Sequence, residues 1–408
     1  MKKKLEHKPL IVLVFLCMAV FGLIDNLKGT LLPSIRLEFG VDYSAIGTML
    51  FAASLGYLLA SLVSGIAADR LGKKTILMFG FVLLIGATAL FYVAKSFPVT
   101  VLLLLMISTG FGCVEVAVNS LGAQIFVTNA AVMMNMTHLF YGLGSSISPK
   151  YAGTMLARSL PWNYIYTITL AILIPGLIYM AFLRFPKTPE EESNNKMPAA
   201  QMLKNKKVWL IVATLGFCTV AELGMANWLV NFLQEVRGMG VEQSSSYMTF
   251  FFAAFMLGRL VGGYIAEKIG YIRIIMYFAI ISMVLFVSGM FLDNSFAFLF
   301  SCIGFFVSIM FPTMMSVIMK EFPNGTSSIM GFAISAAGGI NMIVNWIIGK
   351  TNDLLDVNYG FMSIAAYMLL IVVFIIPLRK MLTFDKSPDP VLADELHHGL
   401  TESEKAGL

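Results

Sequence analysis

Ionisable side chains inside long apolar stretches are the residues of this sequence that can do chemistry. Six stand out by type and position: Asp25, Lys28, Glu115, His138, Glu222 and Arg259. A charge inside a membrane-spanning helix costs roughly 2.5–3.5 kcal/mol on insertion scales, so such a side chain normally faces the protein interior, a partner or water. Carboxyl and imidazole groups held in such places can bind protons or polar solutes.

Glu115 and His138 are the pair best placed for proton transfer. Glu115 lies about seven residues from the cytoplasmic end of an expected helix at 97–122, and His138 about eight from the start of one at 130–156, which puts both roughly 10–12 Å deep. Two antiparallel neighbours can bring them together, and a desolvated carboxyl near a histidine can hold or release a proton near neutral pH. We predict Glu115 as proton carrier and His138 as its modulator or a substrate hydrogen-bonding group. A static buried hydrogen bond is the alternative.

Asp25 and Lys28 are spaced i, i+3 on the first expected helix, where their charges can neutralise each other. An ion pair with a structural role and a site for substrate or proton are both consistent with this spacing. Asp25 is therefore a further candidate for proton coupling, ranked below Glu115.

Polar and aromatic residues of the kind that bind sugars gather in the expected seventh helix. Glu222 lies within three turns of Asn227, Trp228 and Asn231. Carboxylate and amide groups exchange hydrogen bonds with hydroxyls, and an aromatic ring offers a flat surface to the C–H face of a pyranose. This favours sugars over apolar drugs, with an interface anchor and interhelical amide bonds as the open alternative. Further candidates for the same cavity are Asn119, Gln124, Asn135, Asn341, Asn345 and Trp346.

Composition indicates that membrane-spanning helices position these residues. The chain is 58% hydrophobic and 12% charged, which leaves too little polar surface for a soluble globule. Apolar stretches of about twenty residues recur, and each can cross a hydrocarbon core about 30 Å thick. The expected spans of the first half are 9–32, 44–68, 75–95, 97–122, 130–156 and 162–184. Those of the second half are 206–233, 245–267, 272–292, 295–320, 326–350 and 358–380.

One long polar stretch divides the expected helices into two sets of six. Residues 187–205 have the Pro, Glu, Asn and Lys content of a solvated linker. We therefore predict an N-terminal bundle at 1–186, a C-terminal bundle at 206–382 and a disordered cytoplasmic tail at 383–408. Basic residues concentrate on one side of the expected spans, which places both termini in the cytoplasm and the chain in a cell inner (plasma) membrane. The formal charge of +5 thus reflects topology and does not indicate a nucleic-acid partner.

Motifs for catalysis or metal binding are absent from the sequence. The four cysteines lie far apart in apolar stretches without metal-ligand spacing. There is no Walker-type phosphate loop, zinc-protease signature or nucleophile elbow. We therefore expect no enzyme activity, no cofactor and no metal, with energy supplied by an ion or solute gradient. The chain is expected to work as a monomer in the lipid bilayer.

The loop GIAADRLGKKTIL at 65–77 resembles the signature loop between the second and third helices of the major facilitator superfamily, a family of twelve-helix transporters. A weaker copy, GYIAEKIGYIR, follows the second helix of the other half at 263–273. Both copies carry glycines, which allow close helix approach and tight turns. The resemblance implies an all-α membrane fold of two pseudo-symmetric six-helix bundles. The residues expected at this motif and the cytoplasmic gate are Gly65, Asp69, Arg70, Gly72, Lys73, Arg259, Gly263, Glu267 and Gly270.

Further segments resemble the fucose-permease branch of that superfamily, whose members are mostly proton-coupled sugar importers. They are STGFGCVEVAVNSLGAQ at 108–124, NMTHLFYGLGSSISP at 135–149, VAELGMANWLVNFL at 220–233 and GFFVSIMFPTMMS at 304–316. In proton-coupled fucose carriers a first-helix Asp is important. Alignment on LLP at 31–33 puts Gly29 at that place and Asp25 about one helical turn earlier, so the coupling site departs from the pattern of the branch.

The sequence therefore predicts a secondary active transporter that imports a monosaccharide or similar small polar solute with protons, by alternating access. Proton-driven efflux of drugs or metabolites on the same fold is the nearest alternative, because the superfamily loop does not encode direction. A membrane sensor without transport is the alternative from another class, and the intramembrane charges argue against it. An exporter of cationic lipophiles should show an apolar cavity with an unpaired carboxylate, whereas a sugar carrier should show several amides with one or two aromatics.

Overall fold

Every regular element in the described part of the chain is a helix. The computed structural model describes residues 8–126, 130–186, 199–322 and 326–382, and these contain no strand. The expected tail and most of the expected linker lie outside the described residues. An all-helical architecture follows from the apolar composition, because lipid cannot hydrogen-bond to the backbone and a helix satisfies its own N–H and C=O groups.

The helices follow the expected spans, and three spans are each divided in two. The first half contains α2 (Lys8–Asp25), α3 (Leu27–Phe39), α4 (Tyr43–Leu71), α5 (Lys73–Leu90), α6 (Phe97–Ile125), α7 (Ala130–Ala157), α8 (Trp162–Ile168) and α9 (Leu170–Phe182). The second half contains α10 (Ala199–Lys204), α11 (Lys206–Glu235), α12 (Val241–Ile269), α13 (Tyr271–Phe291), α14 (Phe298–Val307), α15 (Met310–Glu321), α16 (Thr326–Leu354) and α17 (Val357–Met381).

Eleven spans in the described residues are long and apolar enough to cross a membrane, three of them formed from split helices. The remaining expected span is α7, which has 28 residues but is not among the eleven. Its asparagine, histidine, lysine and several serines lower its mean hydropathy. Because α7 packs between α2 and α12, protein covers much of it and it needs less apolar surface than a lipid-facing span. The prediction of an all-α multi-span membrane protein is confirmed.

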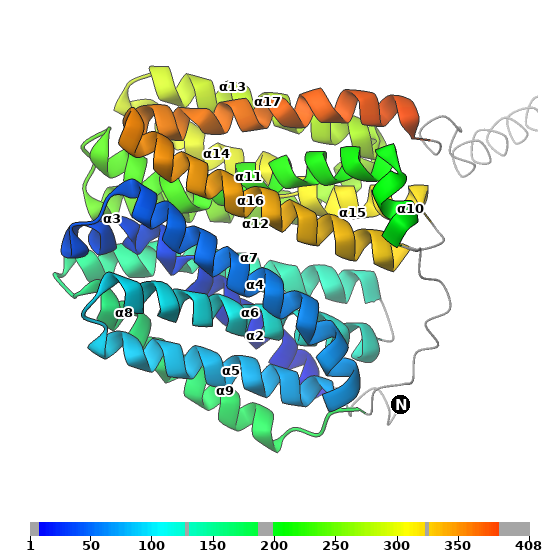
Figure 1. Ribbon diagram of the computed structural model, residues 1–408, viewed down its shortest axis with the longest axis horizontal. Coiled ribbons are helices and arrows are strands. Elements are labelled where there is room, and N and C mark those ends of the chain that lie inside the picture. The colour runs from blue at the N-terminus through cyan, green and yellow to red at the C-terminus, as the bar shows by residue number, and fades with distance from the viewer. Residues whose placement is uncertain (1–7, 127–129, 187–198, 323–325, 383–408) are drawn as a thin grey trace, which may run out of the picture.

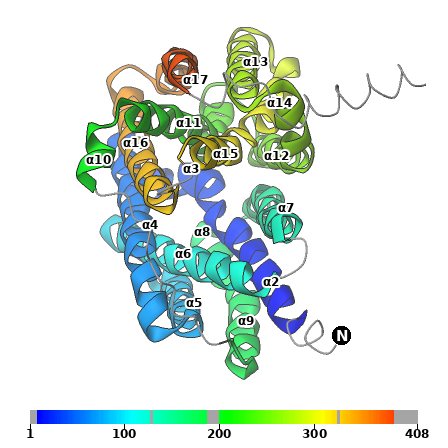
Figure 2. The same ribbon diagram turned by 90° about the vertical axis from the view of Figure 1, so that its right-hand side faces the viewer.

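The helices of the two halves lie on opposite sides of the molecule. Figure 1 shows α2–α9 in the lower part and α11–α17 in the upper part, with most helices running side by side along the long axis. Three helix pairs join the halves: α4 with α16, α7 with α12, and α3 with α11. The view along the helices in Figure 2 shows α4 with α16 on one flank and α7 with α12 on the other.

Several polar contacts between the halves lie at one end of the molecule. We call the end where α11 begins the linker end and the opposite one the far end. At the far end Asp353 of α16 accepts hydrogen bonds from the backbone N–H groups of Tyr43 and Ser44, at 2.8 and 2.6 Å, and from the Ser44 hydroxyl. Further far-end contacts are the ion pairs Arg36–Glu235 at 3.2 Å and Lys150–Glu242 at 2.8 Å, and a hydrogen bond from Lys150 to the Ser246 hydroxyl at 3.3 Å.

Close backbone contact also closes the far end. A Cβ atom added to Gly29 of α3 would overlap the carbonyl oxygen of Ala226 in α11. One added to Gly349 of α16 would overlap the backbone of α4 at Tyr43. These glycines let the helix backbones of the two halves touch. The far end is therefore packed shut.

Candidate functional site

Glu115 lies at the centre of a cluster of charged and polar groups from both halves. The hydroxyl of Tyr57, on α4, donates a hydrogen bond to the Glu115 carboxylate on α6. Asp25 of the first half and Arg259 of the second half both act electrostatically on Glu115. The Glu115 side chain is only partly buried although it lies far from either end of its helix. A carboxylate in this position can exchange a proton with water and sense charges on both halves.

Arg259 connects the cluster across the two halves. Its guanidinium acts electrostatically on Glu115, His138 and Tyr141 in the first half and on Glu222 in the second. The Nε atom donates to the carbonyl oxygen of Ser308 at 3.4 Å, and the guanidinium lies 4.4 Å from the centre of the Phe255 ring. No carboxylate lies within ion-pair distance of it in the part of the chain that the structure describes.

The placement of Arg259 differs from the sequence prediction. It was expected near the cytoplasmic end of its helix, with a gating role. It lies about ten residues before the end of α12, which is roughly 15 Å along the helix axis. From this depth its charge reaches both candidate carboxylates, Glu115 and Glu222. Its electrostatic link to Glu115 and Glu222 was not predicted from the sequence.

His138 and Glu115 share a region without a hydrogen bond between them. Both side chains are partly buried, and both lie within the electrostatic reach of Arg259. The static hydrogen bond that was the alternative interpretation is absent between these two residues, and the Tyr57 hydroxyl of α4 donates to the carboxylate. His138 and Glu115 are therefore linked here through the charge of Arg259 and not by a hydrogen bond.

Asp25 and Lys28 form the ion pair that their spacing allows. The Lys28 ammonium lies 2.5 Å from Asp25 Oδ1, and both side chains are largely buried. The pair spans the break between α2 and α3 at Asn26, whose amide donates to the carbonyl of Gly22 at 2.9 Å and to the Ser145 hydroxyl at 3.0 Å. Pairing compensates much of the cost of keeping the two charges in the membrane.

Asparagines of α11 and α16 form a buried amide cluster. The side-chain oxygen of Asn345 accepts from Asn227 Nδ2 and from Trp228 Nε1, each at 3.1 Å. The Asn345 amide nitrogen donates to the side-chain oxygen of Asn341 at 2.8 Å. The side-chain oxygen of Asn227 has no hydrogen-bond partner among the described residues. Asn231, one turn further along α11, is fully buried. Four of the predicted sugar-binding residues thus meet: Asn227, Trp228, Asn341 and Asn345.

Other predicted binding residues lie elsewhere. Trp346 is 41% exposed and shares the outer face of α16 with Ile343 and Ile347, so it points away from the amide cluster. The side-chain oxygen of Gln124 accepts from Lys73 at 2.8 Å near the linker end. Asn135 is exposed on α7.

Two predicted residues lie closer to the central cluster. Asn119 is one turn beyond Glu115 on α6, and its buried side-chain oxygen has no partner among the described residues. Glu222 is partly buried on α11, within electrostatic reach of Arg259 and Tyr141.

The two signature loops make matching turns. Gly72, between α4 and α5, has φ +88°, and Gly270, between α12 and α13, has φ +97°. These values lie in the region that L side chains rarely adopt, which explains the glycines at equivalent places. Gly65 and Gly263 have open space around them, while Arg70 and Glu267 are exposed. The side chain of Asp69 lies outside what the structure describes.

Two tyrosines near the candidate carboxylates were not predicted from the sequence. Tyr57 donates a hydrogen bond to Glu115. The Tyr141 hydroxyl accepts a hydrogen bond from the Asn26 amide at 3.5 Å. The charges of Asp25, Glu222 and Arg259 also act on Tyr141. A lone tyrosine in an apolar span is a weak signal. Only the rotation of α4 relative to α6 brings Tyr57 to Glu115.

We expect Asp353 to control how often the far end opens. Replacing Asp353 with Ala removes three accepted hydrogen bonds. We expect the closed state to lose about 1 kcal/mol of stability at this exposed site, which raises the ratio of open to closed far ends about fivefold. The measurement is the distance distribution between spin labels at Leu37 and Leu355, both exposed at the far end, in a background lacking the native cysteines. The matched control is Asp356→Ala, which removes a cap of α17 within the second half. Unchanged distributions in the Asp353 variant would refute this role.

The family model of the Major Facilitator Superfamily matches residues 14–349. The glucose/galactose transporter of Brucella abortus biovar 1 (strain 9-941) is 24% identical, over 84% of this chain and 87% of that protein. The L-fucose-proton symporter of Escherichia coli (strain K12) is 22% identical, over 79% of this chain and 86% of that protein.

Solved transporter structures share the fold. A crystal structure of the D-xylose-proton symporter matches with a TM-score of 0.77 at 13% identity, covering 93% of this chain and 99% of that one. A crystal structure of FucP in the outward conformation matches with a TM-score of 0.65 at 18% identity, covering 91% and 99%. At these identities the structural likeness concerns the fold alone.

Proposed function

This chain belongs to the Major Facilitator Superfamily, and we propose that it imports a monosaccharide together with a proton by alternating access between its two halves. The observation that carries the proposal is that Glu115 of the first half and Glu222 of the second both lie within the electrostatic reach of Arg259, beneath a closed far end. The names of the glucose/galactose and fucose relatives support a sugar as the solute. The distribution of basic residues supports a linker end and both termini in the cytoplasm of a bacterial-type inner membrane.

Proton coupling is assigned to Glu115. When the far end is open, the carboxyl takes up a proton and becomes neutral, which removes the cost of an unpaired charge while the halves rearrange. When the linker end opens, Arg259 and the Tyr57 hydroxyl stabilise the ionised carboxylate, and the proton leaves to the cytoplasm. Asp25 stays paired with Lys28 in this scheme. His138 modulates the electrostatic environment of the Glu115 carboxyl.

Sugar recognition is assigned to partly buried polar groups near Arg259. Glu222 and Asn119 offer acceptors to sugar hydroxyls, and the Tyr141 hydroxyl and His138 offer both donors and acceptors. The amide cluster around Asn345 forms one wall, with the unpaired oxygen of Asn227 as a further acceptor. Several amides beside few aromatics suit a sugar better than a cationic lipophile. Efflux is therefore not favoured, and neither is a sensor without transport, given the relatives.

In this proposal the chain acts as a monomer. Uptake into proteoliposomes that contain the purified chain tests this function. A panel of labelled monosaccharides is offered with and without an inward proton gradient, and a sodium gradient serves as the control. We expect at least one neutral hexose or pentose to accumulate only when the proton gradient is imposed. Accumulation that follows sodium, or no flux of any monosaccharide, would reject proton-coupled sugar import.

A further inference from the structure

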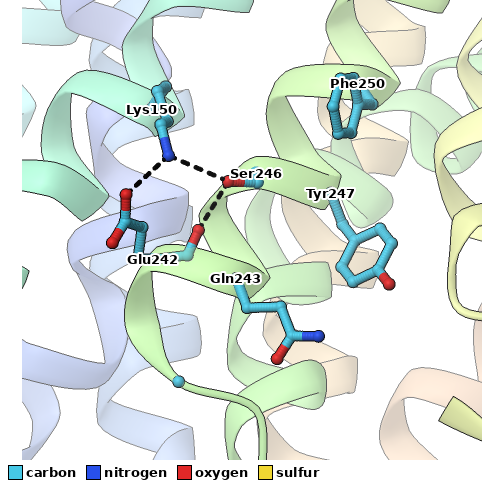
Figure 3. Close-up of a pocket in the computed structure, with 7 residues that line it drawn as sticks. Lys150, Glu242, Gln243, Ser246, Tyr247 and Phe250 are labelled. Carbon is cyan, nitrogen blue, oxygen red and sulfur yellow. Dashed lines mark hydrogen bonds and ion pairs between the residues drawn. The ribbon is translucent and has the colours of Figure 1, made fainter. Parts of the chain in front are cut away.

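A pocket opens on the surface between α7 and α12 near the far end. Its lining is Lys150 of α7 with Glu242, Gln243, Ser246, Tyr247 and Phe250 of α12 (Figure 3). It lies on the flank of the molecule and is distinct from the central cluster around Arg259. It also includes Gly240, directly before the first turn of α12. Nothing in the proposed transport cycle requires this pocket.

The polar groups of the pocket keep unused hydrogen-bonding capacity. The Lys150 ammonium donates to Glu242 Oε1 at 2.8 Å and to the Ser246 hydroxyl at 3.3 Å, while an ammonium has three donors. The second carboxylate oxygen of Glu242 has no hydrogen-bond partner among the described residues. The first-turn N–H groups of α12 also lack intrahelical partners. One cationic donor, one anionic acceptor and a helix N-terminus thus remain available side by side.

An apolar strip continues from the pocket toward the middle of the molecule. Leu143 and Ile147 precede Lys150 on the same face of α7 and are 41% and 50% exposed. Phe250 and Leu257 follow Ser246 on the same face of α12 and are 60% and 54% exposed. Polarity along this seam therefore changes from apolar at mid-depth to charged at the far end. A phospholipid in the adjoining leaflet has its acyl chains and headgroup in the same order.

We propose that this seam binds one zwitterionic phospholipid with a primary ammonium, of the phosphatidylethanolamine type. Its phosphate binds the free donor of Lys150 and the first-turn N–H groups of α12. Its ammonium binds the free oxygen of Glu242 and the side-chain carbonyl of Gln243. Its acyl chains cover Ile147 and Phe250. Because the seam joins the two halves, the bound lipid stabilises the conformation that is closed at the far end.

The test is competition among lipids for the full chain. The protein is extracted from bilayers of equal phosphatidylethanolamine, phosphatidylcholine and phosphatidylglycerol, and retained lipids are measured by native mass spectrometry. We expect one phosphatidylethanolamine per chain to be retained preferentially. Lys150→Ala should reduce its retention about tenfold, as loss of a charge-assisted hydrogen bond implies. Phe250→Ala, which leaves the ion pair intact, should reduce it to a smaller extent.

The matched control is Asp356→Ala, which removes a cap of α17 without touching the pocket or a contact between the halves. It should retain the lipid as the wild type does. Equal retention of phosphatidylcholine or phosphatidylglycerol by the wild type would overturn the proposal, and so would unchanged retention by the Lys150 and Phe250 variants. The assay contains no sugar, so its outcome does not depend on the proposed substrate.

Discussion

Replacing Glu115 with Gln is expected to abolish sugar accumulation against a gradient while exchange of internal for external sugar continues. One coupled proton contributes 1.36 kcal/mol per imposed pH unit, so the wild type should accumulate sugar about tenfold per unit. Gln keeps the size and hydrogen-bonding capacity of a protonated carboxyl but cannot release a proton. The accumulation ratio of the variant should therefore fall to one, as measured by labelled-sugar uptake into proteoliposomes with an imposed pH gradient.

Two controls separate coupling from general damage. Glu235→Gln neutralises a carboxylate at the far end, where it pairs with Arg36, and should leave the accumulation ratio unchanged. Tyr57→Phe removes the hydroxyl that binds Glu115 but keeps the carboxylate, so accumulation should persist with an altered dependence on pH. If the Glu115 variant still accumulates sugar in proportion to the pH gradient, Glu115 is not the proton carrier.

Gly29→Leu is expected to hold the far end open and stop transport. A side chain at this position would overlap the carbonyl oxygen of Ala226, so α3 and α11 could not come together as they do here. An overpacking cost of about 3 kcal/mol would reduce the population closed at the far end about 100-fold. Both uptake and exchange should fall accordingly, because both need the far end to close. The spin-label distance between positions 37 and 355 should lengthen at the same time.

Gly86→Leu is the matched control for this variant. Gly86 lies inside α5, and an added Cβ there meets nothing within 4 Å. The same substitution should therefore leave uptake and the far-end distance unchanged. Normal uptake by the Gly29 variant would mean that the contact between α3 and α11 is not an obligatory part of the cycle.

Helix positions could be read from the sequence, whereas helix rotations could not. Long apolar stretches and the repeated Gly72 and Gly270 turns are local features, so composition and spacing reveal them. In lipid, however, the outer face of a helix is as apolar as its packed face, and periodicity does not distinguish the two. Trp346 was therefore placed in the cavity although it lies on the outer face of α16.

Partners of the intramembrane charges were predicted only when they were close in sequence. The Asp25–Lys28 pair follows from i, i+3 spacing and forms as expected. Tyr57 and Glu115 lie on different helices, so their contact depends on how α4 packs against α6. The electrostatic effect of Arg259 on Glu115 and His138 depends on how closely the second half packs against the first. The breaks at Asn26 and Thr169 were also missed, since neither residue is a strong helix breaker in sequence. The predicted bundle boundaries stay a prediction.

The most direct test of the account measures proton and sugar movement together in the same proteoliposomes. An internal pH indicator and labelled sugar are followed after sugar is added outside, with no gradient imposed at the start. The account predicts that sugar entry acidifies the lumen of wild-type vesicles at one proton per sugar, and that the Glu115→Gln variant exchanges sugar without any change of pH. Sugar entry into wild-type vesicles without acidification, or acidification that persists in the variant, would contradict it.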